Sequence, residues 1–282
     1  MRLTIRDIQA MKNRGERIPM LTAYDYTSAR ILDAAGIPML LVGDSVGFTM
    51  LGHDSTVPVT MGDMIRHTQA VIRGTQHALV VTDMPFMSYQ TDEAEALRNA
   101  GRLMKYAGTQ AVKLEGGTRT ASTIKAIVDC GIPVMGHIGL TPQSVNQFGG
   151  YRVQGKTPKA AAQLLRDAAS LEEAGAFAIV LECVPTPLAQ IITQRCTIPT
   201  IGIGAGPYCD GQVQVLHDML GLIEDFSPKH AKKYAHLSRS ISDAVADYAK
   251  EVTTGDFPTA EHSFTMNNDV LAEISSETQS SA

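Results

Sequence analysis

The feature that most constrains the fold is a regular alternation between short apolar runs and longer segments with helical spacing. The runs are continuously apolar, which is typical of parallel strands covered on both faces. They cover residues 18–25, 39–45, 78–84, 111–117, 132–139, 177–184 and 198–206, and the stretch around 212–220 could supply an eighth. Eight strands that alternate with helices predict an α/β fold, a single (β/α)8 TIM barrel. A doubly wound open sheet remains an alternative, because periodicity does not show whether the sheet closes.

Segments with helical spacing lie between these runs. Residues 27–36, 91–108 and 159–175 carry apolar positions at helical spacing, and each segment ends at a glycine. Thr157 followed by Pro158 is a typical helix opening, with a capping hydroxyl before proline at the first helical position. We therefore expect helices to connect the strands.

The size of the chain favours one catalytic domain. A length of 282 residues suits one α/β barrel, and a hydrophobic content of 44% is enough to bury a sizeable core. The sequence shows no internal repeat and no low-complexity linker, so we predict one barrel domain over residues 1–265. Residues 266–282 are polar and end in SSETQSSA, and we expect a disordered C-terminal tail there.

Charge and composition argue against several classes of partner. The formal net charge is −5 and no basic run interrupts it, so nucleic acid is not expected as a partner. No run reaches the roughly 20 apolar residues that span a bilayer, and the first residues lack the apolar core of a secretory signal. The 4 cysteines are scattered, without a CxxC pair. We therefore expect a cytoplasmic protein without membrane partners.

Polar side chains follow several of the predicted strands at the point where each strand ends. They are Asp44, Ser45, Asp83, Lys113, Glu115, His137 and Glu182. In an α/β barrel the C-terminal strand ends form one rim, where active sites are built. A single acid in such a place often caps the next helix. Because successive strands end in this way, capping is a poor explanation for the whole set, and we expect one site.

Three of these acids suggest a metal site. Asp44, Asp83 and Glu115 come from successive predicted strands and offer oxygen ligands for Mg²⁺ or a similar hard cation. Mg²⁺ usually takes only one or two carboxylates directly and leaves positions for water and substrate oxygens. The alternative is that the acids pair with Lys113, with arginines and with backbone N–H groups.

Glu182 stands apart from the three acids, on the sixth predicted strand and among apolar neighbours. A partly desolvated carboxylate in this position suits a general base. The alternative is a buried ion pair without a role in proton transfer.

Several long segments of the chain resemble the ketopantoate hydroxymethyltransferase family. The resemblance extends from about residue 3 to residue 265. The segments that carry it are LTAYDYTSARILDAAGIPMLLVGDSVG, TDMPFMSY, AVKLEGG, MGHIGLTPQSVNQFGGYRVQGK, VLECVP and IGIGAGPYCDGQ.

The resemblance implies a TIM barrel of the phosphoenolpyruvate mutase/isocitrate lyase type. It also implies transfer of a hydroxymethyl group from 5,10-methylenetetrahydrofolate to 3-methyl-2-oxobutanoate, which gives 2-dehydropantoate (ketopantoate), with Mg²⁺, in a cytoplasmic homodecamer of the pantothenate pathway. By motif position Asp44, Asp83 and Glu115 correspond to the metal-site acids. Asp44, Ser45, Asp83 and Lys113 would contact the keto acid, and Glu182 would accept the proton.

The residue types agree with enolate chemistry. A 2-oxo acid can chelate a divalent ion, which stabilises the enolate that forms when the C3 proton leaves. Lys113 could pair with the substrate carboxylate or the enolate oxygen, and His137 could orient a ligand or a substrate oxygen.

Two other functions are compatible with the same strand-end residues. One is a metal-dependent lyase or mutase of the same superfamily, although such lyases usually carry a KKCGH-like motif that is absent from this sequence. The other is an inactive binding protein that keeps only the barrel. The complete set of acids together with Lys113 argues against it, and metal-dependent turnover would exclude it.

Overall fold

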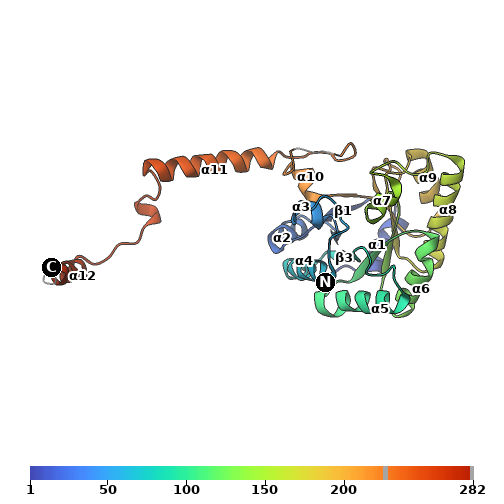
Figure 1. The fold of residues 1–282 in the computed structure, drawn as a ribbon, viewed down its shortest axis with the longest axis horizontal. Coiled ribbons are helices and arrows are strands. Elements are labelled where there is room, and N and C mark those ends of the chain that lie inside the picture. Colours follow the sequence, from blue (N-terminus) through green and yellow to red (C-terminus); the bar gives the residue numbers. More distant parts are fainter. Residues whose placement is uncertain (225–227, 280–282) are drawn as a thin grey trace. The chain divides into compact units, whose positions relative to one another are not determined.

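Eight parallel strands close into a barrel in the computed structural model, which describes residues 1–224 and 228–279 (Figure 1). Each strand pairs in parallel with the next, and β8 pairs with β1. The strands are β1 Ile18–Thr22, β2 Met39–Val42, β3 Leu79–Asp83, β4 Ala111–Glu115, β5 Val134–Gly139, β6 Ala178–Glu182, β7 Thr200–Ile203 and β8 Gly211–Gln214. The predicted barrel is confirmed, and the open-sheet alternative is wrong.

Helices connect the strands and surround the barrel (Figure 1). The helices of the barrel unit are α1 Ile5–Asn13, α2 Tyr26–Ala34, α3 Val46–Thr49, α4 Met61–Gly74, α5 Glu93–Arg102, α6 Ala121–Asp129, α7 Val145–Phe148, α8 Pro158–Glu173, α9 Thr186–Arg195 and α10 Leu216–Leu220. Short 3₁₀ turns cover Thr118–Thr120 and Pro142–Ser144. The predicted opening of α8 is confirmed, because Thr157 Oγ1 accepts a hydrogen bond from the N–H of Ala160 at 3.2 Å.

Two expected elements differ in detail. The helix expected over residues 91–108 is α5 followed by a π-helical turn, Leu103–Ala107, which ends at Gly108 with φ +81°. The eighth strand ends at Gln214, and the rest of the expected stretch forms α10. Leu216 and Leu220 lie at helical spacing there, and Gly221 ends the helix in the left-handed conformation.

The buried side chains form two layers, because successive residues of a strand point to opposite faces of the sheet. On β3, Leu79 and Val81 pack inside the barrel, and Val80 packs outward against the helices. The outer layer is the larger one, and it contains the buried faces of α2, α4, α5, α6, α8 and α9. This alternation decides which strand residues reach the interior of the barrel.

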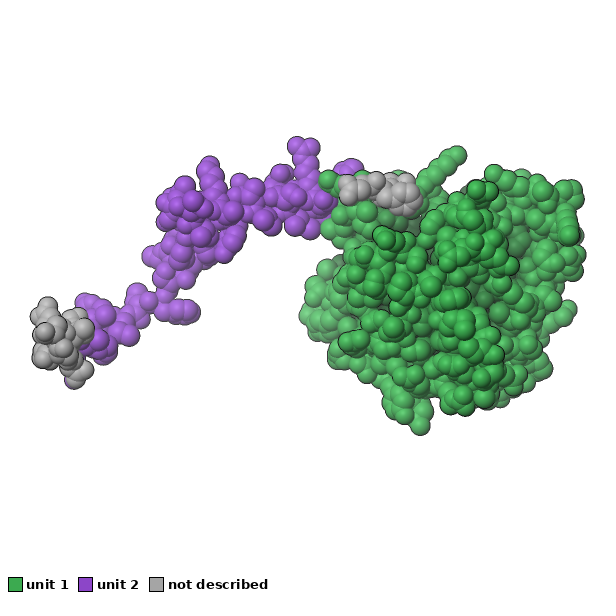
Figure 2. Space-filling model, viewed as in Figure 1, with its two compact units in different colours: residues 1–234 green, residues 235–282 purple. Residues whose placement is uncertain are grey.

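The chain divides into two compact units, Met1–Tyr234 and Ala235–Ala282, which Figure 2 colours separately. The first unit holds the whole barrel. The second contains α11 Leu237–Thr254, a 3₁₀ turn at Ala260–His262 and α12 Asn268–Gln279. The domain boundary expected at residue 265 lies inside the second unit. We expected disorder from residue 266, whereas the structure has α12, in which Val270 and Ile274 lie one helical turn apart; residues 280–282 lie outside the described part.

Within the described ranges, every helix is too short or too polar to span a bilayer.

Candidate active site

Side chains along each strand alternate between the interior and the exterior of the barrel, and most of the predicted site residues occupy interior positions near its mouth. Asp83 lies two residues beyond the inward Val81 on β3, and His137 lies two residues beyond Met135 on β5. The residues with this register are Asp83, Lys113, Glu115, His137 and Glu182. They lie at or near the C-terminal ends of four neighbouring strands, β3 to β6, so they meet on one side of the rim.

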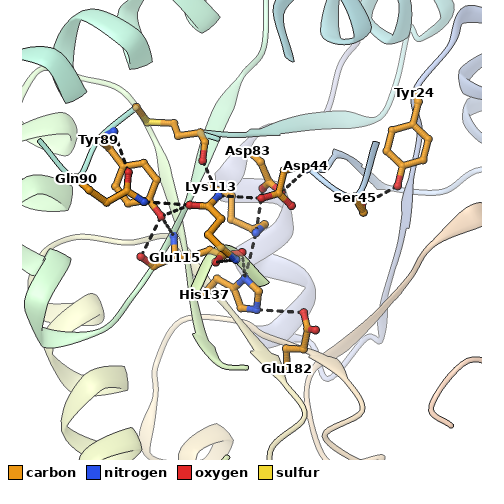
Figure 3. A network of polar contacts seen from close by, with 12 residues as sticks. Tyr24, Asp44, Ser45, Asp83, Tyr89, Gln90, Lys113, Glu115, His137 and Glu182 are labelled. Atoms are coloured by element: carbon orange, nitrogen blue, oxygen red, sulfur yellow. Dashed lines mark hydrogen bonds and ion pairs between the residues drawn. The ribbon is translucent and has the colours of Figure 1, made fainter. Parts of the chain in front are cut away.

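Asp44 and Ser45 reach the same place from the loop after β2. The backbone N–H of Asp44 donates to Asp83 Oδ2 at 2.9 Å, so this loop is fixed to the end of β3. Ser45 Oγ lies 2.8 Å from the hydroxyl of Tyr24, whose pKa burial raises to about 12. Tyr24 is therefore a neutral phenol at physiological pH. The structure thus brings together all seven residues predicted from strand ends (Figure 3).

A buried ion pair lies at the centre of the site. Lys113 Nζ is 3.0 Å from Asp83 Oδ1 and 3.1 Å from Nδ1 of His137. Burial opposes the charge of Lys113, but Asp83, Glu115 and Asp44 outweigh it and raise its pKa. Lys113 is therefore a buried cation, directed at Asp83.

His137 connects two carboxylates from opposite sides of its ring. Nδ1 lies 3.4 Å from Glu115 Oε1, and Nε2 lies 3.3 Å from Glu182 Oε2. Burial and the charge of Lys113 oppose protonation, but Glu115 and Glu182 prevail and raise the pKa of His137 to about 9. The raised pKa favours a protonated ring at neutral pH, although the ammonium group of Lys113, 3.1 Å from Nδ1, is a competing donor on that side of the ring.

Glu182 is the most accessible acid of this group. Its side chain is 15% exposed, whereas that of Asp83 is 3% exposed, and both side chains line the cavity. The neighbouring end of β5 approaches closely: a Cβ on Gly139 would lie 2.2 Å from the carbonyl oxygen of Glu182. Glycine is therefore needed there. Glu182 combines contact with a buried cation and access to the cavity, which a proton acceptor requires.

The balance of charge leaves room for a divalent cation. The four carboxylates of Asp44, Asp83, Glu115 and Glu182 exceed the two cations by two charges when all are ionised. Burial, with the charges of Asp83 and Glu115, raises the pKa of Asp44 well above its usual value, and burial also raises that of Asp83. A bound divalent cation would offset the excess of two negative charges.

The donor set fits Mg²⁺ held by few protein ligands. No group of three or more His, Cys, Asp or Glu side chains in the described part of the chain has the arrangement of a complete metal site. Mg²⁺ commonly needs only one or two carboxylates and completes its shell with water and substrate oxygens. Asp44 and Asp83, which are buried and line the cavity together, can supply these.

The site opens into a cavity of about 1750 Å³. This volume exceeds the roughly 300–1,000 Å³ of an ordinary small-molecule site, so a small acid alone would not fill it. Much of the remaining wall is apolar or aromatic, and includes Phe48, Tyr151, Val184 and Ile203. Phe48 and Tyr151 contact each other edge to face, with ring centroids 6.4 Å apart. The cavity can accept a second, larger and partly aromatic molecule.

The sequence did not single out two buried polar residues behind the acids, Tyr89 and Gln143. Gln143 Nε2 donates to Asp44 Oδ2 at 2.9 Å, and the hydroxyl of Tyr89 donates to Gln143 Oε1 at 2.8 Å. Both residues lie in loops. The only available signal was the polar Gln143 shortly after the fifth strand, beyond the last strand-end position.

Comparisons with known sequences agree on one family. A family model described as ketopantoate hydroxymethyltransferase matches residues 2–260. A 3-methyl-2-oxobutanoate hydroxymethyltransferase of Dehalococcoides mccartyi is 61% identical, over 97% of this chain and 97% of its own. The protein of that name from Chloroflexus aurantiacus is 62% identical, over 96% of each chain.

Solved structures with the same fold are far more distant in sequence. Phosphonopyruvate hydrolase, in complex with oxalate and Mg²⁺, matches with a TM-score of 0.61 and 12% identity, over 99% of this chain and 98% of its own. 2,3-Dimethylmalate lyase, a member of the PEP mutase/isocitrate lyase superfamily, matches with a TM-score of 0.56 and 17% identity, over 99% of this chain and 97% of its own. This chain therefore shares the barrel fold of these phosphoenolpyruvate mutase/isocitrate lyase-type structures, as expected.

Proposed function

Since this chain belongs to the ketopantoate hydroxymethyltransferase family, we propose that it transfers a hydroxymethyl group from 5,10-methylenetetrahydrofolate to 3-methyl-2-oxobutanoate, using Mg²⁺. The product is 2-dehydropantoate, and the reaction is the first step of pantothenate biosynthesis. The observation that carries the proposal is the cluster of buried acids with Lys113 and His137 at the mouth of a cavity larger than a keto acid needs.

Asp44 and Asp83 would hold Mg²⁺, with Glu115 as a ligand directly or through a water molecule. Bound Mg²⁺ would polarise the oxygens of the keto acid and stabilise the enolate charge. Lys113, already a cation at the rim, pairs with the carboxylate of the keto acid or with its enolate oxygen. Ser45 lies beside Asp44 and contributes a hydroxyl to the same substrate.

Glu182 accepts the proton from C3 of the keto acid. His137 supports this role because its Nε2 lies 3.3 Å from Glu182 Oε2, so the imidazolium stabilises the carboxylate and limits its rotation. The carbon that has lost its proton then forms a bond to the one-carbon unit of the folate. Over the whole reaction both C–N bonds that held this unit break, one water molecule supplies the hydroxyl oxygen, and tetrahydrofolate leaves with a proton on each nitrogen.

The setting of this activity is a proposal as well. We propose a cytoplasmic enzyme with small-molecule substrates, assembled as a homodecamer. The support is the family to which the chain belongs.

The test is product formation from 3-methyl-2-oxobutanoate and methylenetetrahydrofolate labelled with ¹³C at the transferred carbon. We expect labelled 2-dehydropantoate with Mg²⁺ and none with EDTA. Labelled product at the same rate in EDTA would refute the metal requirement, and an unlabelled product would refute the folate as donor.

A pair of variants tests the proton acceptor. Glu182→Gln removes the base but keeps the size of the side chain, so we expect keto-acid binding to persist and C3 proton exchange to fall by about 10²- to 10⁴-fold. Glu173→Gln, on the exposed part of α8, is the matched control and should exchange normally. Exchange at the parent rate in Glu182→Gln would assign the base to another residue.

A further inference from the structure

We propose that Gln143 is a positioning residue for this reaction, which orients Asp44 and Glu115 by binding one carboxylate oxygen of each. The inference rests on the proposed function, in which both acids serve the metal and the keto acid. Gln143 lies in the turn Pro142–Ser144 after β5 and is only 5% exposed. Its side-chain amide donates to Asp44 Oδ2 at 2.9 Å, and its backbone N–H donates to Glu115 Oε2 at 3.0 Å.

The amide of Gln143 has one possible orientation. Nε2 also donates to the carbonyl oxygen of Met84 at 2.9 Å, and a carbonyl can only accept. At the other end, Oε1 accepts from the hydroxyl of Tyr89 at 2.8 Å and from Nε2 of Gln90 at 3.1 Å. Nε2 therefore faces two acceptors and Oε1 faces two donors. A flipped amide would place Oε1 against the oxygens of Asp44 and Met84.

Tyr89 fixes Gln143 in turn. Its hydroxyl accepts from the backbone N–H of Glu115 at 3.0 Å, so its own proton is available for Gln143 Oε1. The proton of Tyr89 has two acceptors within reach, and Gln143 Oε1 at 2.8 Å is nearer than the carbonyl oxygen of Glu115 at 3.2 Å.

The contacts form one continuous chain behind the acids. The N–H of Asp44 binds Asp83, Gln143 binds Asp44, and the backbone of Gln143 binds Glu115. Pro142 lines the cavity, but its neighbour Gln143 and the side chain of Tyr89 are not among the described residues that line it. Gln143 therefore acts through the carboxylates and has no direct contact with the substrate space. Oε1 of Glu115, the oxygen that Gln143 does not bind, has no hydrogen bond within the described residues and faces His137 at 3.4 Å.

The test compares Gln143→Met with the parent protein by titration with Mn²⁺, followed by electron paramagnetic resonance. Methionine keeps the length and approximate volume of glutamine but has no amide to donate to Asp44. We expect Mn²⁺ affinity to fall by about 10- to 100-fold, as for other groups that hold metal ligands from behind. Tyr89→Phe should weaken affinity in the same direction. Gln147→Leu is the control, because Gln147 is exposed on the neighbouring α7 and, within the described residues, its side chain accepts a hydrogen bond from Arg119 at 3.4 Å, away from the acids.

Melting temperature and Mn²⁺ affinity together distinguish a positioning role of Gln143 from a purely structural one. If Gln143 served only folding, Gln143→Met would melt at a lower temperature but would bind Mn²⁺ within twofold of the parent once folded. That result would overturn the proposal. If the parent protein itself binds no Mn²⁺, the proposed metal site is wrong, and positioning is then judged by kcat at saturating keto acid. A kcat at least tenfold lower in Gln143→Met than in Gln147→Leu would support it, and a smaller difference would refute it.

Discussion

Replacing Lys113 by methionine should destabilise the barrel far more than replacing an exposed lysine in an ion pair of the same length. Lys113 Nζ lies 3.0 Å from Asp83 Oδ1, and both side chains are almost completely buried. Attraction over this distance is about 5 kcal/mol at an effective dielectric constant of about 20. Methionine fills a similar volume but leaves the charge of Asp83 buried without its partner. Breaking a buried pair in this way typically costs about 3–5 kcal/mol.

Lys125→Met is the matched control. Lys125 Nζ also lies 3.0 Å from its partner, Asp129, but the two side chains are 64% and 61% exposed. Water screens that pair, so its loss should cost less than about 1 kcal/mol. The assay is urea unfolding at pH 7.5, followed by circular dichroism. Equal losses of unfolding free energy in the two variants would show that breaking the buried Lys113 pair is no more destabilising than breaking the exposed Lys125 pair, and would refute the reasoning. Because Asp83 can take up a proton, the deficit of Lys113→Met should shrink as the pH falls.

Three further results are expected. Because the folded-state pKa of His137 is raised to about 9 from 6.5, the stability that its charge contributes is complete below about pH 6.5 and is lost as the pH rises through about 9. Urea unfolding of the parent should show this loss, and His137→Asn should not; equal pH dependence would contradict the assignment. Lys12→Met should lower the free energy of unfolding, measured in urea, by about 2 kcal/mol without changing kcat. Lys12 Nζ binds Asp210 and backbone carbonyls just before the N-terminal ends of β7 and β8, opposite the rim that carries the site. A lowered kcat would show that this end affects the site. Asp83→Ala should weaken Mg²⁺-dependent binding of the keto acid, measured by calorimetry, and unchanged binding would remove Asp83 from the metal site.

The sequence was most informative where local pattern and topology give the same answer. A parallel strand inside a barrel alternates between the interior and the helices, and its last inward residue reaches the rim. Asp83 and His137 follow from this rule, because each lies two residues beyond an apolar side chain that packs inside the barrel. The closing strand was harder to place, because β8 has only 4 residues and alternates glutamine with glycine and valine, and the neighbouring α10 has only 5 residues.

The supporting residues could not be found from local pattern. Gln143 and Asp44 are separated by 99 positions, and their hydrogen bond exists only because the barrel brings two loops together. Tyr89 lies in the loop after β3 and contacts Glu115 at the end of β4. A glutamine or tyrosine in a loop has no periodicity that indicates its partner. The helix α12 was also not expected, because three large apolar residues, Val270, Leu271 and Ile274, give too short a helical pattern to stand out in a polar segment.

The central claim is that this site removes the C3 proton of 3-methyl-2-oxobutanoate with the help of Mg²⁺. Proton NMR of the keto acid in D₂O, with enzyme and with or without Mg²⁺, tests it most directly. We predict loss of the C3 proton signal only with the metal present, and formation of 2-dehydropantoate when methylenetetrahydrofolate is then added. A C3 signal that persists in the presence of folded enzyme, Mg²⁺ and folate would contradict the claim.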